Sequence, residues 1–363
     1  MQIVDKDRVY KCSPDVTATG FTQLMLCVLN NDLENVSKYL SEINAKNSEG
    51  WTALHIACRN SANFSSDEMI DFLLKNGADP NAKNNAGWTP LHMASRYSTN
   101  GSSLATVELL IRNGADLNAR DIKNWTPLHM ASRYSTNGSS LATVELLIRN
   151  GADLNAKTKD NHTSLHMASR GSADDSSIET VDLLLRNGAD PNVKDNDDWT
   201  PLHMASRYSV KGGSSLKTVE ALLRSGADPN AKNNDGWTPL HHASRYSNSD
   251  SSLATVELLL RNGADPNAKN NNGKTPLYLA SRHSNKESSL ETVDALLLSN
   301  AEPINVKTKK LKLELDNKLL KNKVIKLETD VDDMKKLLKE HFDCAPDGPL
   351  YLEAKNRFEN RNY

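Results

Sequence analysis

The chain of 363 residues has few aromatic side chains, only 5% of the total, and its hydrophobic content is a modest 37%. This composition excludes one large round core but suffices for an elongated body built from small layers. No run approaches the roughly 18 apolar residues of a membrane-spanning helix, so we expect no membrane segment. None of the four cysteines forms a Cys-x-x-Cys pair, which argues against a zinc site or a redox motif and is typical of a reducing compartment.

The chain also lacks an excess of one charge. It has 44 basic and 46 acidic residues, and its formal net charge is -2 at pH 7. This balance disfavours nucleic acid as a partner. The chain has no Gly-rich phosphate loop, His-Glu-x-x-His or Gly-x-Ser-x-Gly motif, so we expect no enzyme, no cofactor and no metal. The first residues lack the basic start and apolar core of a secretory signal. We therefore expect a cytoplasmic protein and leave the nucleus open.

Repetition is what the chain has in abundance. The stretch from Trp88 to Ala119 recurs letter for letter from Trp125 to Ala156, which indicates a recent duplication. Related stretches begin every 37 or 38 residues, at Trp51, Trp88, Trp125, His162, Trp199, Trp237 and Lys274. A weaker version upstream, over 21–40, is shorter and is expected to cap the N-terminal end of the array.

The sequence of each unit predicts two short helices joined by a polar loop. In one copy Thr89 suits the N-cap of the first helix and Pro90 its first position, where no backbone donor is needed. Gly114 favours a left-handed end to the second helix. That helix carries an apolar stripe at helical spacing, formed by Leu104, Val107, Leu110 and Ile111. One such pair cannot bury its apolar face alone, so the sequence predicts a stack of pairs, a solenoid.

The stretches Thr-Pro-Leu-His-x-Ala and Asn-Gly-Ala-Asp-Pro-Asn-Ala resemble the two ends of an ankyrin repeat. The resemblance implies an all-α solenoid of about eight units over residues 20–305, after an N-terminal extension, 1–19. The units depart from the family period of about 33 residues. Their extra residues fall between the two helices, in "RYSTNGSS". Asn-rich units of this length with "ASRYS" resemble those of giant DNA viruses of amoebae.

The repeat aligns certain side chains in columns, and two columns are candidate binding sites. All five tryptophans share the position before the first helix, at the edge of the concave face that the resemblance implies: Trp51, Trp88, Trp125, Trp199 and Trp237. Such residues either anchor a partner or brace neighbouring turns.

The second column places arginine, usually followed by tyrosine, at the end of the first helix. Its candidate binding residues are Arg96, Arg133, Arg207, Arg245, Tyr97, Tyr134, Tyr208 and Tyr246. These side chains either brace the helix end or form a cationic, aromatic groove for an acidic or phosphorylated peptide. Single-stranded nucleic acid is the weaker alternative, because a column of acidic residues balances the charge.

Histidine recurs once per unit, at His55, His92, His129, His166, His203 and His241. Successive units hold these side chains a helix layer apart, too far for shared metal ligation. We therefore predict that each histidine forms a hydrogen bond that ties neighbouring turns together.

The C-terminal segment changes character and predicts a coiled-coil helix over 306–342. Its apolar residues alternate at steps of four and three, in the heptad seam Leu313, Asn317, Leu320, Val324, Leu327, Val331, Met334 and Leu338. Valine at a, leucine at d and a lone asparagine at a favour a parallel homodimer through residues 310–341. The alternative is a single helix that folds back on the last unit.

These features predict a protein-binding scaffold with partners of unknown identity, in which dimerisation would present two arrays. One alternative is an adaptor that recruits a ubiquitin ligase or other host machinery through the short tail, 343–363. The other is a passive structural protein, for which tryptophan substitutions would change stability but no binding.

Overall fold

The computed structural model divides into two compact units, Met1–Leu296 and Leu297–Tyr363. The residues that the structure describes are 10–13, 16–60, 66–97, 103–134, 138–171, 178–207, 214–246, 250–282, 287–303 and 306–342. Tyr208 and the tail 343–363 therefore lie outside the described residues, and so does part of every loop between paired helices after the first pair.

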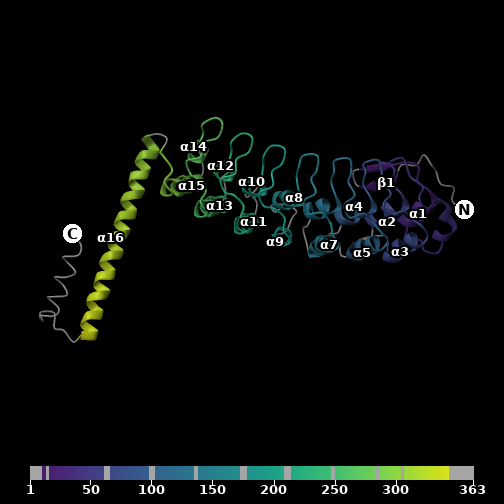
Figure 1. Cartoon of the computed structure of the whole chain (residues 1–363), viewed down its shortest axis with the longest axis horizontal. Helices are drawn as coiled ribbons and strands as arrows, with labels where there is room; N and C mark the ends of the chain where they lie inside the picture. Colours follow the sequence, from purple (N-terminus) through teal and green to yellow (C-terminus); the bar gives the residue numbers. More distant parts are fainter. Residues whose placement is uncertain are drawn as a thin grey trace. The chain divides into compact units, whose positions relative to one another are not determined.

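Over its described residues, the first unit is a stack of helix pairs (Figure 1). The first members of the pairs are α1 (Gln23–Leu29), α2 (Ala53–Asn60), α4 (Pro90–Arg96), α6 (Pro127–Arg133), α8 (Ser164–Gly171), α10 (Pro201–Arg207), α12 (Pro239–Arg245) and α14 (Pro276–Arg282). The second members are the 3₁₀ helix η1 (Val36–Glu42), α3 (Asp67–Lys75), α5 (Ser103–Arg112), α7 (Gly138–Arg149), α9 (Ile178–Arg186), α11 (Ser214–Arg224), α13 (Asp250–Arg261) and α15 (Glu287–Leu298). The predicted solenoid is confirmed.

The helix boundaries follow from the side chains that the sequence singles out. Thr89 caps α4 with its hydroxyl, which accepts a hydrogen bond from the backbone N–H of His92, and Pro90 begins the helix. After α5, Gly114 has a φ of 82°, the left-handed conformation that was predicted. Capping by Thr89 therefore marks where α4 begins.

The core lies between the two helix layers and between neighbouring units. In α4, Leu91 and Ala94 are fully buried, and in α5 Val107 and Leu110 are as well. α4 packs against its own partner α5 and against α2 and α6 in the adjacent units. Burial of these apolar side chains across units is what stabilises each helix pair.

A short hairpin is an addition to the predicted helical fold. The strands β1 (Tyr10–Ser13) and β2 (Val16–Ala18) pair antiparallel within the N-terminal extension. The β-branched residues Val16 and Thr17 favour extended backbone. The sequence therefore carries a local signal for this strand, although the fold prediction rested on the repeat units.

The second unit contains the helix α16 (Val306–Phe342), which matches the predicted helical segment and spans 37 residues. Among the described residues, no helix combines the length and apolar character needed to cross a bilayer.

Candidate functional site

The candidate site is built on the turn that precedes the first helix of each pair. In the turn before α4, the Asn84 side-chain oxygen accepts hydrogen bonds from the backbone N–H groups of Ala86 and Trp88, at 3.0 and 2.9 Å. Gly87 follows with a φ of 77°, and a Cβ there would lie 2.9 Å from the backbone nitrogen of Ile122. The turn is therefore closed by its own asparagine and lies tightly against the next turn.

Backbone hydrogen bonds join successive turns into a ladder. Asn85 donates its N–H to the Glu49 carbonyl at 3.0 Å, and Ile122 donates to Ala86 at 3.1 Å. The same bond recurs at Lys159, Asn196, Asn234 and Asn271. The ladder places equivalent residues of successive turns in straight columns along the array.

The histidine column lies beneath the turns and ties them together, as predicted. His92 Nδ1 accepts a hydrogen bond from the Thr89 N–H at 3.2 Å, and its Nε2 lies 3.0 Å from the Trp125 carbonyl oxygen of the next unit. A carbonyl only accepts, so Nε2 carries the proton and the ring is neutral. Burial lowers the pKa of four histidines of the column to about 4, namely His55, His129, His166 and His203. No group of potential metal ligands converges in the part of the chain that the structure describes.

The tryptophan column packs against the turns and is only partly accessible. Trp51 is buried, whereas Trp88, Trp125, Trp199 and Trp237 are half-buried. The indole N–H of Trp88 donates to a carboxylate oxygen of Asp121 in the next unit, at 3.1 Å. At least this ring therefore has a bracing contact in addition to its exposed surface.

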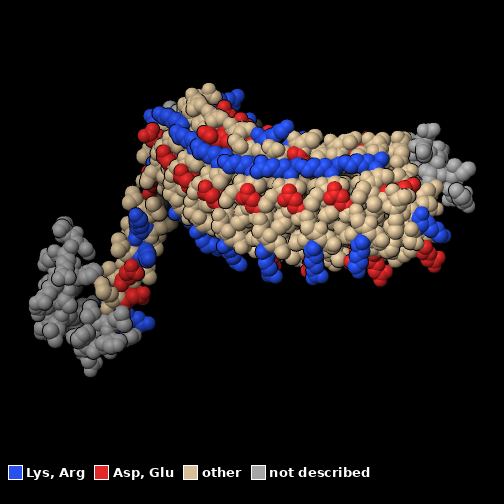
Figure 2. All heavy atoms as spheres, turned by 45° about the vertical axis from the view of Figure 1, so that its right-hand side comes forward, with Lys and Arg blue, Asp and Glu red and all other residues tan. Residues whose placement is uncertain are grey.

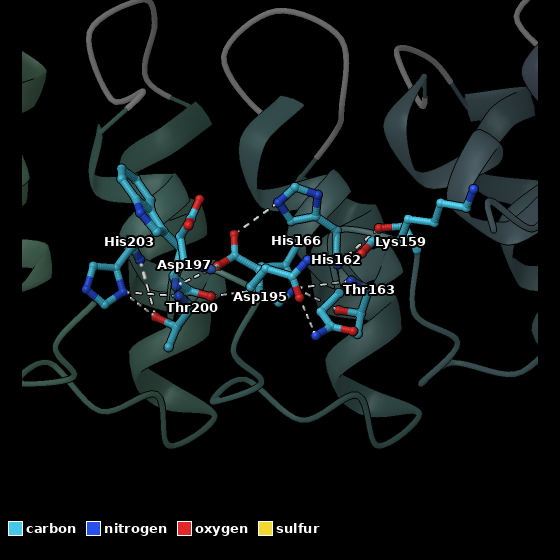
Figure 3. A network of polar contacts seen from close by, with 12 residues as sticks. Lys159, His162, Thr163, His166, Asp195, Asp197, Thr200 and His203 are labelled. Carbon is cyan, nitrogen blue, oxygen red and sulfur yellow. Dashed lines mark hydrogen bonds and ion pairs between the residues drawn. The ribbon is translucent and has the colours of Figure 1, made fainter. Parts of the chain in front are cut away.

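One unit replaces tryptophan with His162 and keeps the same contact (Figure 3). His162 Nε2 lies 3.1 Å from an oxygen of Asp195. Burial opposes ionisation of Asp195, but its hydrogen bonds with the His162 side chain and with the backbone N–H groups of Trp199 and Asp197 outweigh burial and lower the pKa of the carboxyl. The acidic residue at this position is thus a recurring acceptor for the side chain of the preceding turn.

Arginines stack on tryptophans of their own unit and also contact tyrosine rings. The Arg96 guanidinium lies 5.3 Å from the Trp88 ring and 4.5 Å from the Tyr134 ring of the next unit. Equivalent contacts join Arg207 to Trp199 and Tyr246, at 5.3 and 5.8 Å. The remaining contacts within the set join Arg96 to Tyr97, Arg133 to Tyr134, and Arg245 to both Trp237 and Tyr246. We call the surface formed by these tryptophans, arginines and tyrosines the turn face.

A row of basic side chains is a functional candidate that the motif analysis missed. The Lys46 ammonium donates to the Lys83 carbonyl at 2.8 Å, and Lys83 donates to the Arg120 carbonyl at 3.0 Å. Lys194 and Lys232 form the same bond with the unit that follows each of them. Figure 2 shows a continuous row of basic side chains along the array, with acidic side chains spaced beside it. The available signal in the sequence was the "Asn-Ala-Lys" that recurs before most turns, with "Asn-Ala-Arg" at 118–120 and "Asn-Val-Lys" at 192–194.

His242 is a second residue whose environment the sequence did not reveal. It stands where the four preceding units have methionine, and its ring centroid lies 4.4 Å from that of Trp199 and 4.9 Å from that of Trp237. Both ring nitrogens are buried and have no hydrogen-bond partner among the residues that the structure describes. Burial, followed by the charges of His203, Arg207, His241 and Arg245, lowers the pKa of His242 well below 6.5.

The heptad seam of α16 is accessible over most of its described length. Leu313, Leu320 and Leu327 are 65%, 59% and 63% exposed. Val324, Met334 and Asn317 are exposed too, and Val331 is half-buried. The Leu338 side chain lies outside the described residues. Dimerisation through this seam stays a prediction.

Comparison with known proteins agrees with the geometry of the array. A family model described as ankyrin repeats (3 copies) matches seven overlapping stretches that together run from residue 6 to 308. The ankyrin repeat protein L91 of Acanthamoeba polyphaga mimivirus is 36% identical over 85 residues, which are 20% of this chain and 13% of that protein. A second ankyrin repeat protein of the same virus is also 36% identical over 85 residues, or 10% of its length. The matches thus span only small parts of these relatives.

Among solved structures, the ankyrin repeat domain of Bcl-3, a member of the IkappaB protein family, superposes with a TM-score of 0.53. It is 30% identical and covers 69% of this chain and 99% of its own. The stacked helix pairs, the turn ladder and the extent of the family match together show that this chain belongs to the ankyrin-repeat family.

Proposed function

We propose that the array is a scaffold that binds a protein partner along the turn face. Ankyrin repeats are generally protein-binding modules, and the finer assignment depends on one observation. Arg96 and Arg207 of the turn face each stack on aromatic rings of two units, while the arginines and the rings stay partly exposed. Stacking orders these side chains before binding, which lowers the entropy that an interface must overcome.

The charge of this surface favours an acidic or phosphorylated segment of a protein. Guanidinium groups bind carboxylates and phosphates through paired hydrogen bonds. The basic row adds further positive charge on the same array. Nucleic acid is the weaker candidate, because the acidic residues beside this row would repel a continuous phosphate backbone.

The test is a nuclease-treated pull-down from Acanthamoeba lysate, analysed by mass spectrometry, with two matched triple variants. The first changes Arg96, Arg133 and Arg207 to Gln on the turn face. The second removes the same charge from the outer layer at Arg112, Arg149 and Arg186. A protein that the first variant loses and the second retains supports the proposal. Equal recovery by both variants would refute it, provided that circular dichroism shows both to be folded.

We further propose that α16 joins two copies of the chain in a parallel coiled coil. Support comes from its exposed leucine seam and from the residues that flank the seam. In a parallel dimer these would pair Asp316 with Lys321, Lys323 with Glu328, and Asp330 with Lys335, all opposite in charge. Each exposed pair contributes only about 0–1 kcal/mol, so the leucines supply most of the affinity.

Sedimentation equilibrium distinguishes the coiled coil from a solitary helix. The seam variant Leu320→Asp with Leu327→Asp is expected to be monomeric. The control Asn322→Asp with Thr329→Asp adds the same charge on the opposite side of the helix and is expected to stay dimeric. A monomeric unmodified chain, or a seam variant that still dimerises, would contradict this proposal.

A further inference from the structure

A cavity with a volume of about 240 Å³ lies at the C-terminal end of the turn face. The side chains that matter for its chemistry are Trp237, Arg245, Asn270, Lys274, Leu279 and Arg282. Cavities that hold a complete small ligand usually measure about 300–1,000 Å³. This cavity is therefore matched to a single side chain of a larger partner.

The side-chain amide of Asn270 places an N–H donor that lacks an acceptor at this cavity. Its side-chain oxygen accepts hydrogen bonds from the backbone N–H groups of Asn272 and Lys274, at 3.0 and 2.9 Å. These two donors fix which end of the amide is oxygen, because a reversed amide would face them with its own N–H groups. Only 5% of Asn270 is exposed, and its side-chain nitrogen is buried without a hydrogen-bond partner among the described residues.

Two of the equivalent turns, which carry aspartate at this position, show what the Asn270 nitrogen replaces. There, Asp121 offers its second oxygen to the Trp88 indole N–H at 3.1 Å, and Asp195 offers one to His162 at the same distance. In the turn of Asn270, an amide nitrogen occupies the place of that oxygen, next to Trp237. The Asn270 and Trp237 side chains, each with an N–H donor, therefore line the same cavity, and the described residues supply no acceptor for either donor.

The charged side chains around these donors all have the same sign. Arg245 and Arg282 are exposed, Lys274 is half-buried, and no carboxylate lines the cavity. The Arg245 guanidinium is held 5.4 Å from the Trp237 ring, so its position is already ordered. Three cations beside two unpaired donors favour an anionic group that brings oxygen acceptors.

We propose that this cavity binds the carboxylate or phosphate of an acidic side chain on the partner. One oxygen accepts hydrogen bonds from the Asn270 and Trp237 N–H groups, and Arg245 and Arg282 balance its charge. Trp237 and Leu279 contact the apolar part of that side chain. This assignment rests on the proposed binding of a protein along the turn face and names the chemistry of one contact.

The five tryptophans give five indole N–H signals in a nitrogen-15 NMR spectrum of the full chain, and substitution assigns each signal. Two probes are titrated at constant ionic strength, N-acetyl-glutamate amide and inorganic phosphate, with N-acetyl-glutamine amide as the uncharged control. We expect a saturable shift of the Trp237 signal with at least one anion and none with the glutamine probe. The Trp88 signal should not respond, because Asp121 already accepts its hydrogen bond.

Asn270→Asp is the decisive variant, since it restores the acceptor found at Asp121 and places a negative charge in the cavity. Asp121 and Asp195 show that this turn folds with aspartate. The variant should weaken anion binding at least about tenfold, because repulsion between like charges exceeds the roughly 1.4 kcal/mol that tenfold requires. The control Asn84→Asp makes the same change beside Trp51 and should bind normally.

A response to glutamate alone identifies a carboxylate site, and a response to phosphate alone identifies a phosphate site. No saturable Trp237 shift with either anion, or unchanged binding by Asn270→Asp, would overturn the assignment. The pull-down with turn-face arginine variants does not involve this cavity. If both arginine variants recover the same proteins in the pull-down but an anion shifts the Trp237 signal, the scaffold role is refuted and the anion site is supported.

Discussion

Replacing His242 with methionine should stabilise the protein, although the histidine is a well-packed core residue. The position holds methionine in four preceding units, at Met93, Met130, Met167 and Met204. His242 is 5% exposed, and neither of its ring nitrogens has a partner. The methionine side chain fits this environment in the other units, so the substitution removes two buried polar atoms without introducing a new shape.

The size of the effect follows from three contributions. A buried donor or acceptor without a partner costs about 1–3 kcal/mol, which His242→Met recovers. The variant loses ring contacts with Trp199 and Trp237 that contribute about 0.5–1.5 kcal/mol. Sulfur–aromatic contacts of about 0.3–1.5 kcal/mol replace them. The expected gain is therefore about 1–2 kcal/mol.

Urea unfolding at neutral pH, followed by tryptophan fluorescence, measures this gain. With a urea dependence of about 1–3 kcal/mol per molar, the midpoint of the transition that reports on Trp199 and Trp237 should rise by about 0.3–2 M. The reverse substitution Met204→His, one unit earlier, should lower the midpoint by a similar amount. A midpoint of His242→Met that is unchanged or lower would refute the claim that the unpaired nitrogens destabilise the native state.

Two further predictions concern the polar contacts between units. Acid should destabilise the array below pH 6.5, because the unfolded chain binds protons on histidines that the folded chain keeps neutral down to about pH 4. Each such histidine, for example His129, contributes on the order of 3 kcal/mol to the stability of the folded state, and this contribution is lost as the pH falls from 6.5 to 4. Urea midpoints that stay level from pH 7 to pH 5 would contradict this prediction. Asp121→Asn should cost about 1–2 kcal/mol, because it keeps the bonds to the Lys123 and Trp125 backbone but leaves the Trp88 indole without its acceptor. Its urea midpoint and its Trp88 indole NMR signal check this, and unchanged values for both would count against the bond.

Much of the array could be predicted because each unit repeats its signals. Thr89, Pro90 and Gly114 act within a few residues, through capping and backbone conformation, and such local effects can be read without a structure. The inter-unit histidine bond was also predictable, since one position recurs at a fixed period and leaves its ring next to the following turn. The tryptophan and arginine columns were foreseen as columns for the same reason.

The cavity and the buried His242 could not be predicted, because they depend on differences between units. Asn270 and Asp121 look alike as turn residues, and only their contacts with the preceding tryptophan separate a satisfied donor from an unpaired one. The basic row was hidden for a different reason. Its lysines balance acidic residues in the total charge, and only the stacking of turns shows that they lie in one line.

The hydrogen bond between successive units has a consequence for the history of the gene. The histidine of each unit bonds to a backbone carbonyl at the same position of the next unit, as His92 does to Trp125 and His129 to His162. Excision of one whole period within the duplicated stretch would leave each surviving turn with a backbone partner of the same kind. Unequal exchange between the copies can therefore lengthen or shorten the chain without passing through a product that fails to fold. The length of the array can therefore change by whole units.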